Sequence, residues 1–232
     1  SSSMIYQIKP VIGDSSKKRL IKYIQGDNWI TEHKFTKKFE KEFAKFTKSK
    51  ECICFPNGTT TLTAILSCLN LKKNDEVLVS NFTMIASANA ARILGLKVKL
   101  VDISNDDLCM SPEDLKKKIN KKTKMIVVEN PGSNTFEFQD LSKIVNLAKK
   151  KKIFTFLDNT WGTPLYLKPL KLGFDMSFSS ATKYFSGHSD AMGGSLAVNK
   201  KVFKQIMFFY KLSGYRMSAD EAYLIIRGLR TL

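Results

Sequence analysis

The residues best suited to chemistry are an acid and a lysine that each follow an apolar segment. Asp158 comes directly after the apolar run 154–157, and Lys183 comes shortly after the next run. Because ligands of open α/β sheets bind at the carboxyl ends of the strands, we expect Asp158 to face a cleft. A lysine among small polar groups, here Ser180 and Thr182, can lose its proton and attack a carbonyl carbon.

An acid and a reactive lysine are what pyridoxal 5′-phosphate requires of a protein. The lysine forms a Schiff base with the aldehyde of the cofactor, and the acid pairs with the pyridinium nitrogen. The acid keeps that nitrogen protonated, and the cationic ring then withdraws electrons from a substrate carbanion. We therefore predict that Lys183 and Asp158 hold pyridoxal 5′-phosphate.

A phosphate site is predicted at residues 57–61, where one glycine and three threonines follow an apolar run and open a helix. Backbone N–H groups and the positive end of a helix attract anions. An ordinary capped helix start would explain this stretch equally well if it stood alone. With the acid and the lysine in place we favour the cofactor interpretation. The candidate cofactor-binding residues are then Gly58, Thr59, Thr60, Asp158, Ser180, Thr182 and Lys183.

Seven short apolar runs alternate with amphipathic stretches from residue 51 onward. Such alternation indicates a mostly parallel sheet covered by helices on both faces, a three-layer α/β fold. The strands are predicted at 52–55, 76–79, 98–101, 125–128, 153–157, 174–178 and 195–198. Helices are predicted at 34–48, 59–69, 85–94, 112–119, 141–150, 200–211 and 219–232. Residues 1–50 form an N-terminal arm and helix in this prediction, and residues 51–232 form one α/β domain.

The carboxyl-terminal half resembles a known family at its most chemical residues. Residues 175–189, DMSFSSATKYFSGHS, are similar to the pyridoxal-phosphate attachment site of the Cys/Met metabolism enzymes at every signature position. Within that family, residues 129–133, 187–192 and 227–232 most resemble the cystathionine β-lyases. The resemblance covers about residues 128–232.

This resemblance implies the large domain of the fold-type I pyridoxal-phosphate enzymes. Lys183 would form the Schiff base and shuttle protons, Asp158 would pair with the pyridinium nitrogen, and Ser180 and Thr182 would bind the phosphate. The implied reaction is a β-elimination that breaks a carbon–sulfur bond of an amino-acid substrate. Active sites of this fold lie between subunits, so the resemblance also implies a homodimer.

The amino-terminal half resembles a different branch of the same fold type. Similarity to the nucleotide-sugar aminotransferases extends over about residues 26–127 and is strongest at 26–31, 39–44, 56–60 and 79–86. It implies phosphate binding by Gly58 and Thr59. Met84 stands where that family usually stacks an aromatic side chain on the cofactor ring, and Phe82 is the candidate substitute.

Together the two resemblances describe a hybrid chain with a join near residues 127–130. Both families carry a smaller C-terminal domain that grips the substrate carboxylate, and by this resemblance it lies beyond Leu232 and is absent. We therefore expect cofactor binding with reduced or no turnover. The alternatives are a nucleotide-sugar aminotransferase, which needs the same lysine and acid, and a non-catalytic scaffold of recombined or designed origin.

The composition limits other classes of function. The formal net charge is +17, but it comes almost entirely from lysines at predicted helix ends and turns. Nucleic-acid readout favours arginine and stacked aromatic side chains, so we expect no nucleic-acid partner. Four cysteines and two histidines show no metal-ligand spacing. Without a signal pattern or an apolar run of roughly 20 residues, we expect a cytoplasmic protein with no membrane partner.

Three further side chains have structural interpretations that we favour over chemical ones. Trp161 is expected to pack beneath the cofactor strand rather than to stack on a substrate. His188 is expected to support the loop that carries the lysine. Arg227, on the closing helix, is expected to form ion pairs at the surface.

Overall fold

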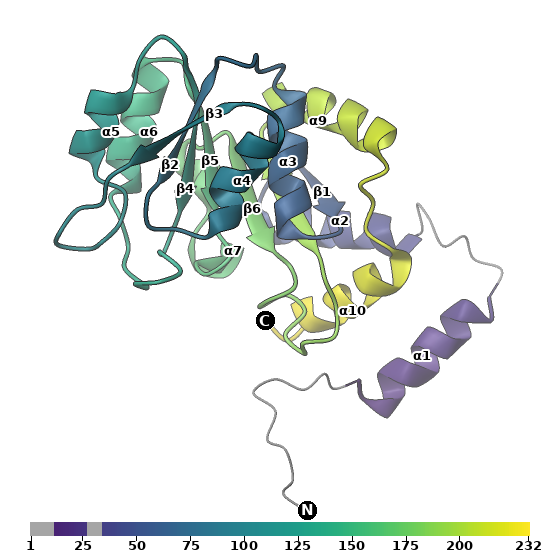
Figure 1. Cartoon of the computed structure of the whole chain (residues 1–232). Helices are drawn as coiled ribbons and strands as arrows, with labels where there is room; N and C mark the ends of the chain where they lie inside the picture. Colours follow the sequence, from purple (N-terminus) through teal and green to yellow (C-terminus); the bar gives the residue numbers. More distant parts are fainter. Residues whose placement is uncertain (1–11, 27–33) are drawn as a thin grey trace, which may run out of the picture.

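The computed structural model describes residues 12–26 and 34–232, so the predicted motif at 26–31 lies almost wholly outside the described part of the chain. A seven-stranded sheet forms the centre of the molecule, and helices cover both of its faces (Figure 1). This arrangement confirms the predicted three-layer α/β fold.

All seven predicted strands are present, each within two residues of its predicted bounds. They are β1 (Glu51–Phe55), β2 (Glu76–Ser80), β3 (Lys97–Val101), β4 (Thr123–Glu129), β5 (Phe154–Asp158), β6 (Met176–Ser180) and β7 (Gly194–Val198). Their order across the sheet is β1-β7-β6-β5-β4-β2-β3. The pairs from β3 to β6 are parallel, whereas β7 is antiparallel to both β1 and β6. The sheet is therefore mixed but mostly parallel.

The predicted helices are also present, and the part of the chain that the structure describes has three further ones. The predicted ones are α2 (Lys34–Thr47), α3 (Gly58–Cys68), α4 (Ile85–Ile93), α5 (Pro112–Lys118), α6 (Leu141–Lys150), α9 (Lys200–Ser213) and α10 (Ala219–Leu229). The additional ones are α1 (Asp14–Ile24), α7 (Thr163–Tyr166) and α8 (Pro169–Leu172). α7 and α8 have four residues each, too few to show a helical period in the sequence.

The central strands are buried on both faces, which explains their nearly continuous apolar sequences. In β2, Val77 and Val79 pack in the core formed with α3, α4 and α9, whereas Leu78 packs with α5 and α6. β4 repeats this pattern, with Val127 on the first face and Ile126 on the second. Because successive side chains of a strand point to opposite faces, each strand anchors both helical layers.

A third cluster joins α2 and α10 to the loop that carries Lys183. Phe43 of α2 meets Phe185 edge-on, with ring centroids 4.9 Å apart. The backbone of α10 approaches this loop closely at Gly228. A Cβ atom there would lie 2.0 Å from the carbonyl oxygen of Phe185 and 2.2 Å from that of Ser186. Helix and loop therefore pack backbone to backbone directly behind Lys183.

Helix ends follow local signals in the sequence. The side chain of Ser111 accepts a hydrogen bond from the N–H of Asp114 at 3.2 Å, and Pro112 opens α5, as predicted. Gly173 ends α8 with a φ of 100°, a conformation that favours glycine. These signals fix where the connections between helices and strands begin.

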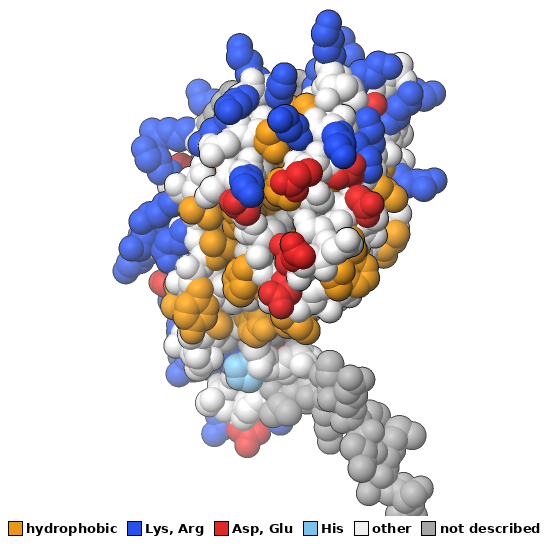
Figure 2. All heavy atoms as spheres, turned by 90° about the vertical axis from the view of Figure 1, so that its left-hand side faces the viewer, with side chains coloured by type: hydrophobic (Ala, Val, Ile, Leu, Met, Phe, Trp, Pro, Cys, Tyr) orange, Lys and Arg blue, Asp and Glu red, His pale blue; other side chains and the backbone are white. Residues whose placement is uncertain are grey.

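Lysine side chains are spread over the surface. Figure 2 shows lysine and arginine side chains around the upper part of one face, with aspartate and glutamate side chains between and below them. Several lie in the last turns of α5 and α6, where a positive charge complements the helix dipole. Across residues 12–26 and 34–232, no helix combines the length and the apolar character needed to cross a membrane.

Replacing Gly228 by alanine tests the close approach of α10 to the Lys183 loop. The added Cβ would collide with backbone carbonyls, so we expect a loss of about 1–3 kcal/mol in the free energy of unfolding. Chemical denaturation measures this loss. Gly13→Ala is the control for space, because nothing lies within 4 Å of a Cβ at that position. Since Gly13 is the N-cap of α1, its effect should be limited to the capping preference, below ~1 kcal/mol. Equal unfolding midpoints for Gly228→Ala and the parent would contradict the packing described.

Candidate active site

The carboxyl ends of β4, β5 and β6 place three polar side chains along one edge of the sheet. Glu129 lies opposite Asp158 in the register of β4 and β5, and β6 ends beside them at Ser180. The amino end of α3 faces the same edge, and a cavity of about 510 Å³ lies between them. All seven residues predicted to bind a cofactor line it: Gly58, Thr59, Thr60, Asp158, Ser180, Thr182 and Lys183. The structure thus brings the set together, and what its members bind stays a prediction.

Asp158 ends β5 and is held by the turn that follows it. One of its carboxylate oxygens accepts hydrogen bonds from both the N–H and the hydroxyl of Thr160, at 2.9 and 2.5 Å. Burial raises the pKa of Asp158 to about 6, and the neighbouring Glu129 carboxylate adds to the rise. The Thr160 hydrogen bonds and the positive charge of Lys183 act in the opposite direction. Asp158 is therefore a poorly solvated acid that would gain from a cationic partner.

Lys183 lies in the turn after β6, and its backbone fixes where the side chain begins. Its N–H donates to the carbonyl of Ser180 at 3.2 Å, and its own carbonyl accepts from the N–H of Gly187 at 2.8 Å. Thr182 ties the same turn to the start of β7, because its hydroxyl accepts from the N–H of Gly193 at 3.0 Å. The side chain of Lys183 therefore enters the cavity from a constrained backbone.

The amino end of α3 is a capped helix start that lines the cavity. Asn57 caps the helix by accepting the N–H of Thr60 at 2.9 Å, and the carbonyl of Asn57 accepts the N–H of Thr61 at 3.2 Å. The N–H groups of Gly58 and Thr59 lie in the first turn of α3, where the N–H groups of any helix have no acceptor within the helix. A Cβ on Gly58 would lie 2.7 Å from the ring of Phe178, so glycine allows α3 to approach β6.

Thr60 lines the cavity, but its polar groups are committed to the cap. Its hydroxyl donates to the carbonyl of Asn57 at 2.9 Å and accepts the N–H of Asn57 at 3.3 Å. The free donors at this helix end therefore lie at Gly58 and Thr59 rather than at Thr60. The sequence showed the capping pattern, but it did not show which of the adjacent threonines would supply it.

Sequence reasoning missed two residues of the site. Thr160 bridges two strands, because its hydroxyl donates to Asp158 and accepts the N–H of Ser180 at 2.8 Å. Glu129 lines the cavity beside Asp158 and accepts a hydrogen bond from the hydroxyl of Thr83 at 2.7 Å. The sequence contains a feature that points to each of these two residues. A threonine two residues after an aspartate favours such a local bond, and Glu129 ends a predicted strand next to that of Asp158.

At the position predicted for ring stacking, Met84 lines the cavity. Phe82 does not: it borders a separate hollow with Leu108, Cys109 and Met110. The structure thus places Met84, rather than the candidate substitute Phe82, beside the seven cavity residues.

His188 and Arg227 both support the loop after Lys183. His188 Nδ1 lies 2.7 Å from the carbonyl oxygen of Ser186, in agreement with the structural role expected for it. The expectation of surface pairing is wrong for Arg227. Its guanidinium pairs at 2.5 Å with Asp190, whose side chain is only 1% exposed, because the packing of α10 on the loop buries the pair.

The residues present fit pyridoxal phosphate by the chemistry of their donors. Asp158 is an acid whose ionised form is poorly solvated and would be stabilised by a protonated ring nitrogen. Lys183 brings a primary amine to the same cavity, and the amino end of α3 presents N–H donors to an anion. One cavity therefore offers the three groups that this cofactor requires.

Comparison with known proteins gives consistent results. The "L-alanine/L-glutamate racemase" of Wolbachia pipientis is 42% identical over 120 residues, which cover 52% of this chain and 30% of that protein. The "Cystathionine beta-lyase" of Coxiella burnetii is 30% identical over 200 residues, 84% of this chain and 50% of that protein. The crystal structure of metB from Corynebacterium glutamicum superposes with a TM-score of 0.76 at 28% identity, covering 85% of this chain and 51% of that one.

The chain spans about half the length, or less, of these relatives. A family model described as "Cys/Met metabolism PLP-dependent enzyme" matches residues 31–232, across the predicted join at 127–130. The aminotransferase resemblance and the hybrid origin stay predictions from the sequence. The chain belongs to the Cys/Met metabolism family of PLP-dependent enzymes, whose cofactor is pyridoxal 5′-phosphate.

Proposed function

We propose that this chain is the cofactor-binding part of a cystathionine lyase that breaks a carbon–sulfur bond at Cβ of an amino acid. The observation that carries the proposal is the meeting of Asp158, Lys183 and the amino end of α3 in one cavity. The similarity to the cystathionine β-lyase of Coxiella burnetii over 84% of the chain supports this substrate class. A homodimer and a cytoplasmic location belong to the same proposal.

The roles follow from the positions of the side chains. Bound pyridoxal phosphate supplies an electron sink for the negative charge that forms at Cα of the substrate. Asp158 would hold a proton on the ring nitrogen, and Gly58, Thr59, Ser180 and Thr182 would bind the phosphate. Lys183 would hold the bound cofactor through its amine. Its free Nζ then takes the proton from Cα, and the protonated Nζ can return a proton to the departing sulfur.

Covalent attachment at Lys183 is the first test. The parent protein incubated with pyridoxal phosphate should gain an absorbance band near the edge of the visible range, and borohydride should fix the cofactor to the peptide that contains Lys183. Lys183→Ala should lose both signals because, among the described residues, the cavity that Asp158 lines has no other lysine. Lys150→Ala, on the exposed end of α6, is the matched control and should keep them.

The reaction assay separates the alternatives. Release of a thiol and pyruvate from cystathionine supports the lyase. Glutamate-dependent formation of pyridoxamine phosphate would instead support the aminotransferase. A colourless parent protein with no adduct after borohydride treatment would contradict the proposal and leave the non-catalytic scaffold.

Asp158→Asn should stabilise the cofactor-free protein while weakening its hold on the cofactor. The pKa of Asp158 is raised to about 6 in the folded state, above the unfolded value of about 3.9. The folded state therefore binds the proton more tightly, and this contribution to stability is present below pH ~4 and lost as pH rises through ~6. Above pH ~6 the variant should be more stable by about 1–3 kcal/mol, and near pH ~4 the difference should vanish.

Asp114→Asn is the control of opposite sign. A hydrogen bond from Lys118 lowers the pKa of Asp114, so its ionised form stabilises the fold at neutral pH. Removing that charge should reduce stability at pH 7 and have less effect as the pH falls. Denaturant unfolding over a pH series measures both variants. An Asp158→Asn protein less stable than the parent at pH 8 would contradict the burial cost assigned to this acid.

A further inference from the structure

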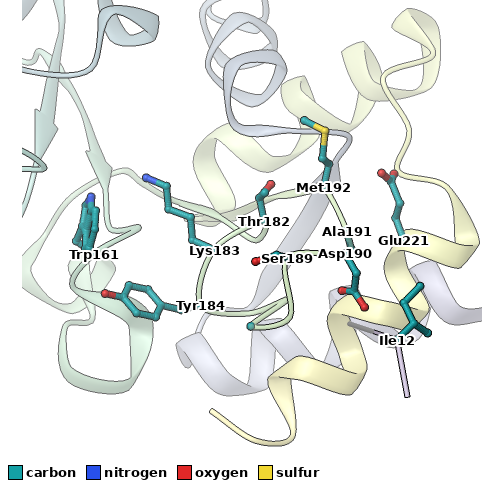
Figure 3. Close-up of a pocket in the computed structure, with 11 residues that line it drawn as sticks. Ile12, Trp161, Thr182, Lys183, Tyr184, Ser189, Asp190, Ala191, Met192 and Glu221 are labelled. Carbon is teal, nitrogen blue, oxygen red and sulfur yellow. The ribbon is translucent and has the colours of Figure 1, made fainter. Parts of the chain in front are cut away.

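The side chain of Trp161 stands beside the amino group of Lys183. Nζ lies 5.1 Å from the centroid of the indole ring, within the roughly 6 Å over which an aromatic face attracts a cation. Figure 3 shows the amino end of Lys183 pointing toward Trp161 at one side of a second cavity, of about 910 Å³. The unattached lysine therefore rests against an aromatic face.

Neighbouring rings hold the indole in this position. Phe136 meets it edge-on, with centroids 5.0 Å apart and an interplanar angle of 82°. Tyr184, which follows Lys183 in the chain, also meets the indole edge-on, with ring centroids 5.9 Å apart and an interplanar angle of 77°. The Thr160 bonds to Asp158 fix the preceding residue of the turn. The turn that places the acid therefore also places the ring.

The indole acts on Lys183 through its face and not through its N–H. That N–H is buried and has no hydrogen-bond partner among the described residues. Both it and the lysine ammonium are donors, so they cannot bond to each other. An ion pair would hold an ammonium strongly, whereas an exposed ring face attracts it weakly and takes no proton from it. Such a contact suits a lysine that must leave and return.

We propose that Trp161 is a positioning residue for Lys183, whose indole face holds the amino group when it is protonated and not bonded to the cofactor. The inference rests on the proposed attachment at Lys183. When a primary amine displaces the lysine, a bond forms between that amine and the aldehyde carbon of the cofactor. The bond from that carbon to Nζ breaks, and the two amine protons pass to Nζ. Nζ leaves as a neutral amine that can act as a base. Once it has taken up a further proton, from Cα of a substrate or from water, it moves to the ring face.

This role has a consequence for the displacement equilibrium. The ring stabilises only the released lysine, so removing it should shift the equilibrium toward the attached form. More amine is then needed to displace half of the lysine. The free energy of a cation–π contact corresponds to a change of about three- to thirty-fold in the concentration of amine that displaces half of the lysine.

The test follows displacement of Lys183 by 2-aminoisobutyrate, a primary amine with no Cα proton to lose, through the absorbance of the cofactor. Trp161→Leu should raise the half-displacing concentration about three- to thirty-fold, and Trp161→Phe should fall between it and the parent.

The chain has only two tryptophans. In a Trp29→Phe background, increasingly fluorinated tryptophan at position 161 weakens the ring face without changing its shape. The half-displacing concentration should rise in step with fluorination.

Phe208→Leu is the matched control, because it removes an exposed ring on α9 that lines neither cavity, and its half-displacing concentration should stay within about twofold of that of the parent. The fluorinated series decides the question if Trp161→Leu does not fold. Equal half-displacing concentrations across that series would overturn the role of Trp161 while leaving the attachment site intact. Failure of borohydride to trap the parent at Lys183 would instead overturn the proposed function, and this inference with it.

Discussion

The site depends on an acid that is kept partly out of water at the carboxyl edge of a parallel sheet. An ionised carboxylate in such a place is costly unless hydrogen bonds and an opposite charge compensate. Thr160 supplies the hydrogen bonds and Lys183 a positive charge, yet the pKa of Asp158 is still raised to about 6. The compensation is incomplete, and a bound cation would complete it. The fold holds this unsatisfied acid in place because β5 is anchored in the core on both faces.

Close contacts at two glycines fix the other parts of the site relative to Asp158. Gly58 brings the first turn of α3 against Phe178 on β6, and Gly228 brings α10 against the loop behind Lys183. The buried pair of Arg227 and Asp190 fastens the same loop to α10. The lysine, the helix end and the acid are therefore set by packing on one rigid sheet. This is the condition for a site that must hold a ring between two side chains.

The fold was predictable because its strands and helices follow simple periods. The apolar runs of β2 and β4 required burial on both faces, and Ser111 with Pro112 marked the start of α5. α7 and α8 were not predictable, since four residues carry no period. α1 lies in a segment where no strand–helix alternation guided the prediction.

Site residues that follow the ends of strands could be predicted from the sequence. Residues that act through hydrogen bonds between strands could not. Asp158 and Lys183 could be placed from the strand pattern and the types of their neighbours. The bridging hydroxyl of Thr160 depends on the register of β5 and β6, which the sequence alone does not give. The surface interpretation of Arg227 failed for a similar reason, because the burial of Asp190 is produced by the packing of distant segments.

The most direct test of this account is a crystal structure of the chain with pyridoxal phosphate. The account predicts an Asp158 oxygen at hydrogen-bond distance, about 2.7–3.0 Å, from the ring nitrogen. It also predicts a covalent bond between Nζ of Lys183 and the aldehyde carbon, with the phosphate at Gly58 and Thr59. A ring nitrogen turned away from Asp158, or a cofactor bound elsewhere on the chain, would contradict it.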